Sequence, residues 1–323
     1  MVYRSEKPIL FEIRDFLTPK ECQEIINIAK RQGLQYGTTQ RSDMVGTRLF
    51  LYDRNNDRRL DVDEMRTTLE NSFDVYLRPD EIEKMYNDLS MDANSDKIIE
   101  ANEIRHILAS PELLANYIAE LARTSPWLKG RHSKNTWIYP DKSQDKVIAD
   151  VTSRVAELTK IPMVLMNKSH IQVVQYDTGG HYNVHLDSAD AAGAQRTPCC
   201  LSGTIPCRSC RWMTILFYLN DVAEGGQTAF PVADNETYFE TEFRSSHRMD
   251  LHEHCYDANL TVQPEQGKAL GWWNHFVDST TGWLGPHDKF SMHGSCPIIL
   301  GEKWIANFWI RVSDNRLKDL ELL

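Results

Sequence analysis

The feature that most constrains the fold is a series of short strand-like segments between residues 165 and 313. Glycine, proline and asparagine separate these segments, and each has the alternating or continuous apolar pattern of a single strand. The segments are HIQVVQY, MTILFYLN, LTVQP, KALGWWNH and KWIANFWIRV. Strands of this kind pair antiparallel and close into a barrel or jelly roll. The charged stretch 233–259 interrupts them, and we expect it to be a surface loop.

Helical segments precede this β region. In DFLTPKECQEIINIAKRQG, Thr18 is a candidate N-cap, Pro19 occupies the first helical position and Glu21 completes a capping box. We therefore predict an α+β protein in three parts. These are a helical support in residues 1–44, a helical pair in 45–125 and the β domain in 126–323.

Residues 45–125 contain two acidic loops flanked by helical patterns. The loops begin at Asp53 and Asp92, 39 residues apart. Each places oxygen-bearing groups where a twelve-residue EF-hand loop needs calcium ligands, with a backbone carbonyl at position 7. Leu60 and Ile99 stand at position 8, where a short strand would join the two loops. The predicted ligands are Asp53, Asn55, Asp57, Arg59, Asp61 and Glu64 in the first loop and Asp92, Asn94, Asp96, Ile98, Glu100 and Glu103 in the second.

Both loops depart from the EF-hand pattern at position 6, where glycine normally allows a sharp turn. Arg58 and Lys97 occupy this position. A left-handed backbone costs such residues on the order of 1 kcal/mol, and each side chain adds a positive charge near the ion. Two interpretations follow, a calcium-binding EF-hand pair and an EF-hand scaffold that does not bind calcium.

Charge and hydropathy argue against two classes of protein. The formal net charge is -10 and no basic run is present to neutralise phosphates, so the chain is not expected to bind nucleic acid. No stretch reaches the roughly 18 to 20 apolar residues of a membrane span. The first residues, MVYRSEKPILFEIRDF, lack the apolar core of a signal peptide. A membrane anchor is expected only in a segment outside this chain.

Seven cysteines, four of them between 199 and 210, occur together with three N-x-[ST] sequons. Clustered cysteines and glycosylation acceptors favour an oxidising secretory compartment. A zinc site that uses Cys207 and Cys210 is the alternative, and Cys296 is expected to be a buried small apolar side chain. The pairing of the other cysteines stays open. The sequons begin at Asn167, Asn235 and Asn259, and the cysteines in question are Cys199, Cys200, Cys207, Cys210 and Cys255.

The segment QYDTGGHYNVHLDS carries a metal-binding pattern. His185 and Asp187 are two residues apart, so their side chains leave the same face of a strand. His293 in FSMHGSCP is a third candidate ligand on a neighbouring strand. Two histidines and one carboxylate leave adjacent coordination positions open, which suits non-haem iron(II) with a co-substrate and O2. Lys303 shares a strand face with Trp309, and a cation on an apolar face calls for an anion such as a dicarboxylate.

Four segments resemble the catalytic domain of the prolyl 4-hydroxylase family: QVVQYDTGGHYNVHLDS, TILFYLNDVAEGGQTAFP, GKALGWWNHF and HGSCPIILGEKWIANFWIR. FLTPKEC and RHSKNTWIY resemble the family's helical support and the segment after it, and an EF-hand insertion between them resembles the endoplasmic-reticulum branch. The resemblance implies a double-stranded β-helix dioxygenase that converts 2-oxoglutarate to succinate and CO2 while it hydroxylates prolyl residues. Collagen-like and hypoxia-inducible-factor-like peptides are the implied substrates. Fe(II), 2-oxoglutarate, O2, ascorbate and Ca2+ are the implied cofactors, and the implied location is the endoplasmic reticulum lumen, with a membrane anchor.

The resemblance also implies roles by position, with His185, Asp187 and His293 as the iron ligands. Lys303 and Tyr176 would bind the distal carboxylate of 2-oxoglutarate. Tyr182 and Trp309 would lie beside the substrate proline, and His181 is expected to lie near the site without binding the metal.

Two other functions stay open at this point. The same iron centre could hydroxylate another side chain such as lysine or asparagine, and the chain could be a calcium-sensing binding module with an inactive barrel. The presence of all three iron ligands together with Lys303 favours an active enzyme.

Overall fold

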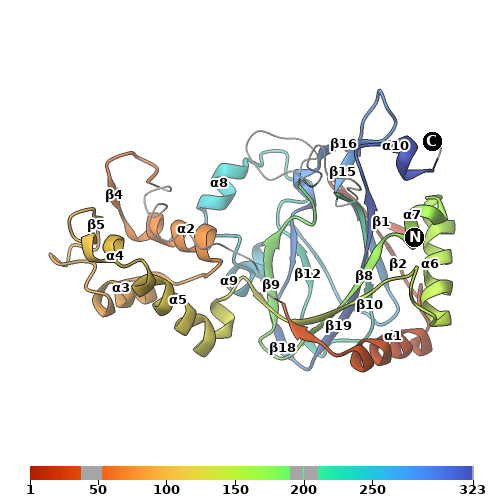
Figure 1. Ribbon diagram of the computed structural model, residues 1–323, viewed down its shortest axis with the longest axis horizontal. Coiled ribbons are helices and arrows are strands. Elements are labelled where there is room, and N and C mark those ends of the chain that lie inside the picture. Colours follow the sequence, from red (N-terminus) through yellow and green to blue (C-terminus); the bar gives the residue numbers. More distant parts are fainter. Residues whose placement is uncertain (38–52, 190–198, 200–209, 322–323) are drawn as a thin grey trace. The chain divides into compact units, whose positions relative to one another are not determined.

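The computed structural model describes residues 1–37, 53–189, 199 and 210–321. These residues form two compact units. The first unit contains Met1–Gly37, Ser133–Tyr238 and Leu251–Leu323, and the second contains Thr38–His132 and Phe239–Asp250. Figure 1 shows that the first unit holds the large sheets, whereas the second is mostly helical. The helix expected just before the first acidic loop lies outside the described residues.

An eight-stranded antiparallel sheet is the main layer of the first unit. Its central strand, β19, is buried along most of its length, as expected for a segment rich in aromatic and β-branched residues. The predicted runs at 170–176 and 303–312 are confirmed as β8 and β19. The strands, in spatial order, are β1 (Val2–Glu6), β2 (Ile9–Ile13), β14 (Ala269–Trp273), β10 (Cys210–Tyr218), β19 (Lys303–Val312), β8 (His170–Tyr176), β7 (Lys134–Ile138) and β3 (Gln35–Tyr36).

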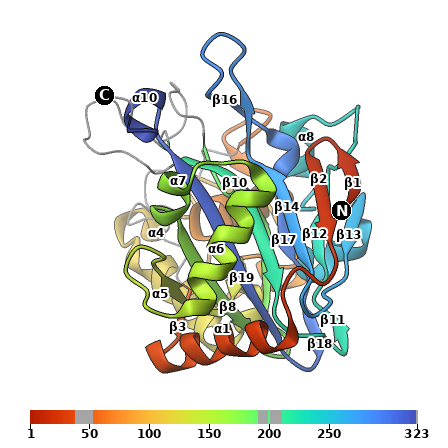
Figure 2. The ribbon, with the colours of Figure 1, turned by 90° about the vertical axis from the view of Figure 1, so that its right-hand side faces the viewer.

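Helices α1 (Pro19–Gln32), α6 (Lys146–Thr159) and α7 (Met163–Asn167) pack on one face of this sheet, as Figure 2 shows. The predicted capping box is confirmed, because Thr18 accepts a hydrogen bond from the Glu21 amide and Glu21 accepts one from the Thr18 amide. The apolar stripe of α1 lies in the same core as the side chains on this face of the sheet. The helices therefore close one side of the sheet and leave its other face for the site.

A smaller antiparallel sheet faces the main sheet across a second core. It contains β13 (Leu260–Val262), β12 (Thr228–Phe230), β17 (His293–Ser295) and β9 (His181–His185), in that order. Phe230 of the small sheet meets Trp272 of the main sheet edge to face, with ring centroids 5.3 Å apart. Two short pairs complete this unit, β11 (Glu224–Gly225) with β18 (Ile298–Leu300) and β15 (His275–Val277) with β16 (Leu284–His287).

The stretch 233–259 is not the continuous loop that its charge predicts. It contains α8 (Glu240–Ser245), α9 (Leu251–His254) and a 3-10 turn at Cys255–Asp257. Phe243 and Leu251 are buried, so each short helix presents an apolar anchor that the abundance of charged residues conceals in the sequence. The division between the units falls between α8 and α9.

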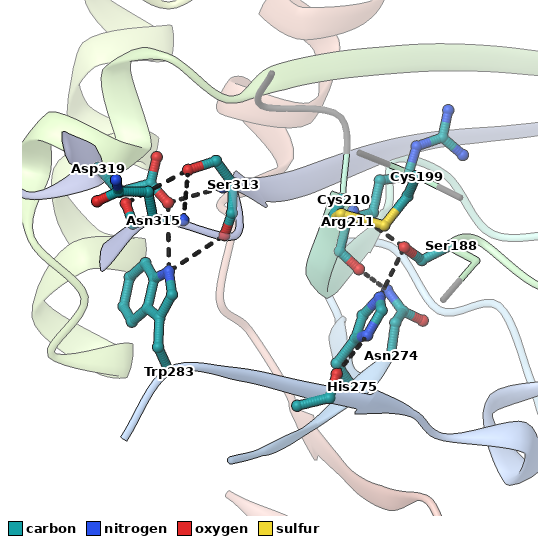
Figure 3. The surroundings of a disulfide bond; sticks show 11 residues. Ser188, Cys199, Cys210, Arg211, Asn274, His275, Trp283, Ser313, Asn315 and Asp319 are labelled. Atoms are coloured by element: carbon teal, nitrogen blue, oxygen red, sulfur yellow. Dashed lines mark hydrogen bonds between the residues drawn. A yellow bond between two sulfur atoms is a disulfide. The ribbon is translucent and has the colours of Figure 1, made fainter. Parts of the chain in front are cut away.

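Two disulfides lie in the described residues, Cys199–Cys210 and Cys255–Cys296. The first, shown in Figure 3, excludes the zinc site at Cys210, because that sulfur is already bonded. The second corrects the expectation for Cys296, which is buried but bonded to Cys255. Residues 255 and 296 are far apart in the sequence, and β12, which pairs with both β13 and β17, brings the segments that carry them together. Cys200 and Cys207 lie outside the described residues.

The C-terminal helix α10 (Arg316–Asp319) is tied to the first unit by a polar cluster drawn in Figure 3. A carboxylate oxygen of Asp319 accepts hydrogen bonds from the Ser313 amide at 2.7 Å and the Trp283 indole at 3.3 Å. Both bonds go to Oδ2 of a carboxylate that is fully buried.

The second unit has its own apolar core, built on Leu60, Leu69, Met85 and Ile99. The short strands β4 (Arg59–Leu60) and β5 (Ile99–Glu100) pair antiparallel, which confirms that position 8 of each acidic loop joins the two loops. The other elements are α2 (Val62–Phe73), α3 (Pro79–Asp88), α4 (Arg105–Ala109), α5 (Glu112–Thr124), a 3-10 turn at Pro126–Leu128 and β6 (Arg131–His132). In the part of the chain that the structure describes, no helix has the length and apolar character needed to cross a bilayer.

Candidate active site

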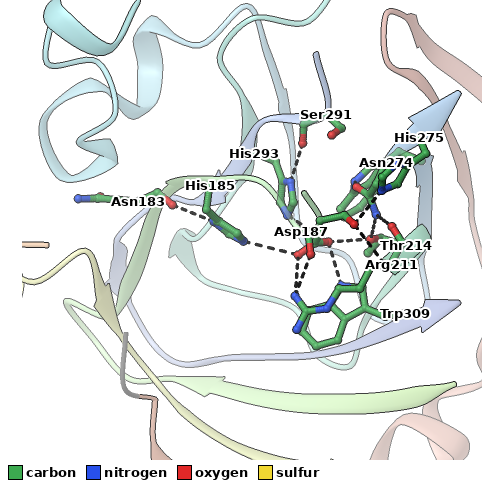
Figure 4. Close-up of polar contacts among 12 residues, drawn as sticks. Asn183, His185, Asp187, Arg211, Thr214, Asn274, His275, Ser291, His293 and Trp309 are labelled. Atoms are coloured by element: carbon green, nitrogen blue, oxygen red, sulfur yellow. Dashed lines mark hydrogen bonds and ion pairs between the residues drawn. The ribbon is translucent and has the colours of Figure 1, made fainter. Parts of the chain in front are cut away.

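His185, Asp187 and His293 come together between the two sheets of the first unit (Figure 4). His185 on β9 is directly opposite His293 on β17 in the antiparallel pair, and Asp187 follows two residues after His185. One ligand atom from each residue lies within 4.8 Å of the others. The Asp187 carboxylate oxygens are 3.8 Å from Nε2 of His185 and 3.6 Å from Nε2 of His293. The sequence pattern could not show this proximity, which depends on strand pairing.

A backbone carbonyl oxygen holds Nδ1 of each imidazole. Nδ1 of His185 is 2.9 Å from the Asn183 carbonyl oxygen, and Nδ1 of His293 is 2.8 Å from the Ser291 carbonyl oxygen. A carbonyl oxygen only accepts, so each Nδ1 carries the proton and each Nε2 offers its lone pair. Both lone pairs are thus available to one metal ion, in the tautomer that metal-binding histidines normally adopt.

Gly294 allows β17 to lie this close to β9. A Cβ at this position would be 2.5 Å from the Tyr182 carbonyl oxygen and 2.4 Å from the Leu251 side chain. Any larger residue would push the two strands apart and separate the two histidines.

Asp187 is buried, and three neighbouring side chains act on its carboxylate. Oδ2 accepts hydrogen bonds from the Thr214 hydroxyl at 2.7 Å and the Trp309 indole at 2.9 Å, and Nη1 of Arg211 is 3.7 Å from Oδ1. Burial alone would raise the pKa of Asp187, but the adjacent His293, Arg211 and His185 and the Thr214 bond lower it below the usual range. The carboxylate is therefore ionised at neutral pH, as a metal ligand must be.

A second line of hydrogen bonds fixes Thr214 in place. The Asn274 side-chain amide donates to the Thr214 hydroxyl at 2.8 Å and to the Arg211 carbonyl at 3.0 Å, and its own oxygen accepts from the Trp272 indole at 3.0 Å. Thr214 and Asn274 are fully buried. The orientation of Asp187 thus depends on a chain of satisfied polar groups that extends into the main sheet.

Lys303 is fully buried at the start of β19, directly opposite Tyr176 on β8. Its Nζ donates to the Ser295 hydroxyl at 2.8 Å and lies 5.4 Å from the centre of the Tyr176 ring. Burial lowers the pKa of Lys303 to about 7. No carboxylate pairs with this ammonium among the described residues, so the pocket has the electrostatics of a receptor for an anion.

The two residues expected beside a substrate lie in different environments. Tyr182 is partly exposed and its ring stacks on His185, with centroids 3.7 Å apart. Trp309 is only 4 % exposed, and its indole N–H holds Asp187. Trp309 therefore positions Asp187. His181 is buried, with Nδ1 at 3.2 Å from the Gly179 carbonyl, and lies outside the metal cluster.

Several residues of the site are not predicted from the sequence. Thr214, Ser295 and Asn274 are ordinary polar residues in strand-like segments and carry no local signal. Arg311 could have been found, because it continues the alternation of Lys303 and Trp309 and so lies on the same face of β19.

The two acidic loops of the second unit have nearly identical internal bonding. In the first, Asp53 accepts from the Arg58 amide at 2.8 Å and Glu64 accepts from the Arg54 amide at 2.9 Å. The second loop repeats both bonds, from the Lys97 amide to Asp92 at 2.8 Å and from the Ala93 amide to Glu103 at 3.0 Å. The side chains of Asn55, Asp57, Asn94 and Asp96 likewise accept from amides within their own loops.

Position 6 of each loop has the left-handed backbone expected there, with φ of 64° at Arg58 and 65° at Lys97. The Lys97 ammonium is 2.7 Å from the Glu83 carboxylate on α3. The positive charge at position 6 of the second loop is therefore paired with a carboxylate of that helix. Arg59 and Glu100 form an ion pair of 2.9 Å across β4 and β5. Asp61 caps α2 by accepting from the Glu64 amide, and Ile98 precedes β5.

The three sequons lie in the first unit. Asn167 ends α7 and is exposed, and Asn259 is also exposed although its amide donates to the Ala233 carbonyl. Asn235 is partly exposed and accepts from Thr237, the third residue of its own sequon.

Residues 171–311 match the model of the 2OG-Fe(II) oxygenase superfamily. The chain is 35% identical over 336 residues to a curated protein of Homo sapiens named transmembrane prolyl 4-hydroxylase, and 34% identical to its counterpart in Mus musculus. In both cases the alignment covers 97% of this chain and 65% of the relative, so the chain spans less than two thirds of these proteins. Prolyl 4-hydroxylase 13 of Arabidopsis thaliana is 32% identical over 201 residues, which is 62% of this chain and 61% of that protein.

Among solved structures, a viral collagen prolyl hydroxylase from Paramecium bursaria Chlorella virus-1, described with 2OG, aligns at a TM-score of 0.46 and 19% identity. That alignment covers 94% of this chain and 96% of the other.

Proposed function

Since this chain is a relative of the transmembrane prolyl 4-hydroxylases and carries a domain of the 2OG-Fe(II) oxygenase superfamily, we propose that it hydroxylates prolyl residues of peptides or proteins. Iron(II), 2-oxoglutarate and O2 are its proposed cofactors, with ascorbate as reductant. We propose a double-stranded β-helix as its fold type. The observation that carries the proposal is the cluster of His185, Asp187 and His293, the last two of them buried, together with the anion-receptive Lys303.

The donor set fits iron(II). Two imidazole lone pairs and one carboxylate lie within 4.8 Å of one another, and this donor set would hold iron(II) while leaving coordination positions for a co-substrate. Each donor is held by hydrogen bonds that do not depend on the metal. We therefore assign His185, Asp187 and His293 as the iron ligands.

The chain's own residues bind and orient the reactants. When bound, the iron centre with 2-oxoglutarate and O2 supplies the oxidising power for hydroxylation of C4 of proline. Lys303 neutralises the distal carboxylate of 2-oxoglutarate, and the Ser295 hydroxyl keeps the ammonium in place. Tyr176 forms the aromatic wall beside that ammonium. Tyr182, stacked on His185 and partly exposed, is the proposed contact for the apolar face of the substrate proline.

The test is succinate formation from 2-oxoglutarate with iron(II), ascorbate and a panel of proline-containing peptides. Collagen-like and hypoxia-inducible-factor-like sequences belong in this panel, together with lysine and asparagine peptides for the alternative side chains. We expect turnover that a proline peptide stimulates and that Asp187→Ala abolishes. Equal turnover in the variant, or stimulation only by lysine or asparagine peptides, would contradict the proposal.

We also propose that the acidic loops form an EF-hand pair that binds calcium and modulates the enzyme. The paired strands β4 and β5 and the left-handed residues at position 6 support this interpretation. A calcium titration should change both the thermal unfolding midpoint and peptide turnover. If neither changes, the loops are scaffold only.

The proposed location is the lumen of the endoplasmic reticulum, with a membrane anchor outside this chain. Two disulfides support an oxidising compartment, and the human and mouse relatives are named as transmembrane proteins. Exposed Asn167 and Asn259 are the better glycosylation candidates, with Asn235 the third. Expression in a secretory host followed by glycosidase treatment tests the sequons, and an unchanged mass would exclude all three.

A further inference from the structure

Residues 247–251 connect the two units along the chain. His247 belongs to the second unit, which includes the chain up to Asp250, and Leu251 begins α9 in the first unit. The charged stretch 233–259 therefore contributes residues to both units. Only four peptide bonds separate His247 from Leu251, so little chain is available to absorb a displacement at either end.

The second unit holds His247 through a buried carboxylate on α2. Nδ1 of His247 donates to Oε1 of Glu70 at 2.9 Å, because a carboxylate oxygen only accepts. The same oxygen lies 3.2 Å from Nε of Arg66, and all three residues are buried. A buried charge that loses a partner is strongly destabilising. We therefore expect His247 to move with α2 rather than to separate from it.

The backbone of His247 has a conformation that is uncommon outside glycine. Its φ is 58°, in the left-handed region. The amide of Asp250, which is also buried, donates to the His247 carbonyl at 3.1 Å. Strained backbone of this kind persists only where surrounding contacts impose it. The bond to Glu70 is such a contact, so the fold and not local preference fixes His247.

Helix α2 also carries a proposed calcium ligand. Glu64 is position 12 of the first acidic loop and lies on α2 six residues before Glu70, about 9 Å along the helix axis. Its carboxylate accepts from the amides of Arg54 at 2.9 Å and Asp61 at 3.2 Å. Calcium in the loop would take this carboxylate as a ligand, and calcium binding to sensor EF-hands shifts their helices. A shift of α2 would reach His247 through Glu70.

The other end of the segment holds the strand of a proposed iron ligand. The Leu251 amide donates to Oδ1 of Asn183 at 2.9 Å, and both residues are buried. The backbone carbonyl of Asn183 is the acceptor that holds Nδ1 of His185, as Figure 4 shows. Asn183 thus connects the start of α9 with the imidazole of His185.

A disulfide fixes the far end of α9 in the same unit. Cys255, which directly follows α9, is bonded to Cys296, three residues after the proposed iron ligand His293. At its near end, the Leu251 side chain packs on Gly294 of β17, where a Cβ would lie 2.4 Å from it. Because both ends of α9 are held, a displacement of Leu251 acts on β9 and is not lost in a free loop.

We propose that His247 and Asn183 are positioning residues that couple calcium binding in the first acidic loop to iron(II) binding at His185. The inference rests on the proposed function, on its iron site and its calcium-binding loops, and names how the loops act on the iron site. Calcium orders α2 through Glu64, and iron orders β9 through His185. Each ion thus removes conformational freedom that the other would otherwise have to remove, so the two ions bind with positive cooperativity.

The first experiment measures this coupling by equilibrium titration of the full chain, without O2 and without turnover. Iron(II) is titrated with and without saturating calcium, and calcium is titrated with and without iron(II). Each ion should lower the Kd of the other by the same factor, about fivefold or more, because coupling between sites is reciprocal and typically amounts to about 5- to 150-fold. In Asp187→Ala, which lacks the iron-site carboxylate, iron(II) should leave the calcium Kd unchanged.

The second experiment repeats both titrations with His247→Phe, which keeps a ring and removes the bond to Glu70. The coupling factor should fall close to one. His254→Phe is the matched control, because His254 also bonds a carboxylate, that of Asp257, and this variant should keep the wild-type factor. Asn183→Leu removes the acceptor at the other end and, with enough iron(II) to saturate it, should abolish the coupling as well. This variant decides if His247→Phe does not fold, and the wild-type factor decides if neither folds.

The outcomes separate this inference from the proposed function. Wild-type protein that binds both ions, with each Kd unchanged or raised by the other ion, would overturn the coupling and keep both binding sites. A wild-type coupling factor in His247→Phe or Asn183→Leu would overturn the role of these residues. Protein that binds iron(II) but no calcium would overturn the calcium-binding loops together with this inference, and it would leave the prolyl hydroxylase intact.

Discussion

The proposed iron site and the acidic loops both contain carboxylates, but these carboxylates are held in different ways. In the iron site, Asp187 is buried and accepts hydrogen bonds from Thr214 and Trp309, which belong to other strands. In the first acidic loop, Asp53 and Glu64 accept hydrogen bonds from amides of their own loop. One site is fixed by the tertiary fold and the other by a local segment of the chain.

This difference in hydrogen bonding indicates what kind of metal binding each site suits. Ligands fixed by distant strands keep their geometry whether or not a metal is bound, which suits a catalytic centre that must hold iron in one position. Ligands fixed within one short segment of the chain can move with little change in the rest of the protein, which suits an ion that binds reversibly. Substitutions in the two regions should therefore differ in size and in kind.

The largest expected effect is the loss of the iron carboxylate. Asp187→Asn removes the only charged ligand and should reduce iron affinity and turnover by more than about 100-fold, since loss of a group that merely supports a metal ligand already costs about 10- to 100-fold. Iron binding is measured by titration and turnover by succinate formation. The control is Asp319→Asn, which alters a buried carboxylate outside the metal cluster. This variant should lower stability and leave iron affinity unchanged. Similar iron affinity in wild type and Asp187→Asn would remove Asp187 from the ligand set.

The next effect concerns Lys303, the proposed partner of the co-substrate carboxylate. Lys303→Met keeps the volume and removes the charge, and it should raise the KM for 2-oxoglutarate by about 10- to 100-fold because a charge-assisted bond is lost. Iron affinity should not change. Lys268→Met is the matched control, since Lys268 is also buried but pairs with Glu265. An unaltered KM for 2-oxoglutarate in Lys303→Met would refute the assignment.

The same lysine should make co-substrate binding depend on pH. Its pKa, lowered by burial to about 7, means that the neutral form dominates at higher pH. The apparent KM for 2-oxoglutarate should rise by up to about tenfold per pH unit above 7, because only the protonated fraction binds the anion. Between about pH 7 and pH 10.5, Lys303 keeps its proton in the unfolded chain but loses it in the folded protein. The free energy of unfolding of the ligand-free protein should therefore rise with pH over this range. Urea unfolding of Lys303→Met should lack that part of the pH dependence.

A smaller effect is expected from the support of the iron carboxylate. Thr214→Val removes the hydroxyl that holds Asp187 and should weaken iron binding by about tenfold, the lower end of the range for such groups. Thr152→Val also deletes a buried hydroxyl, one that bonds the Ile148 carbonyl in α6, and should not alter iron affinity. Equal iron affinities in the two variants would show that Asp187 is oriented without Thr214.

The smallest effect belongs to the acidic loops. Arg58→Gly and Lys97→Gly relieve a left-handed backbone that costs about 1 kcal/mol, so each should tighten calcium binding by about fivefold. Lys160→Gly relieves a similar backbone, with φ of 58°, at the end of α6 and should raise stability without changing calcium affinity. Isothermal titration would measure the affinities. Unchanged calcium affinity in both loop variants would mean that position 6 does not limit binding.

The sequence predicts the local features of the molecule well. The N-terminal cap at Thr18, the strands β8 and β19 and the strand that joins Leu60 to Ile99 all follow from patterns within a few residues. The iron cluster could be proposed because two of its members are two residues apart in a strand. These features depend on periodicity and turn chemistry, which a single sequence displays.

The features that the sequence does not predict are non-local. Cys255 meets Cys296, and Arg211 meets Arg311, only because of the order and register of strands in the folded protein. The short helices α8 and α9 are hidden among charged residues, and only Phe243 and Leu251 anchor them. Polar supports such as Asn274 give no sign of their partners before the register is known.

Strand β19 has a further consequence for how such an enzyme can change over generations. Lys303, Trp309 and Arg311 all belong to one face of this strand, with the first and second about 20 Å apart at roughly 3.3 Å per residue. Replacement of a single side chain on the opposite face alters packing alone, whereas insertion or deletion of one residue within β19 would turn part of this set away from the site. A lineage that keeps this chemistry should therefore tolerate volume-conserving apolar substitutions on the core side of β19 and almost never change the length of the strand.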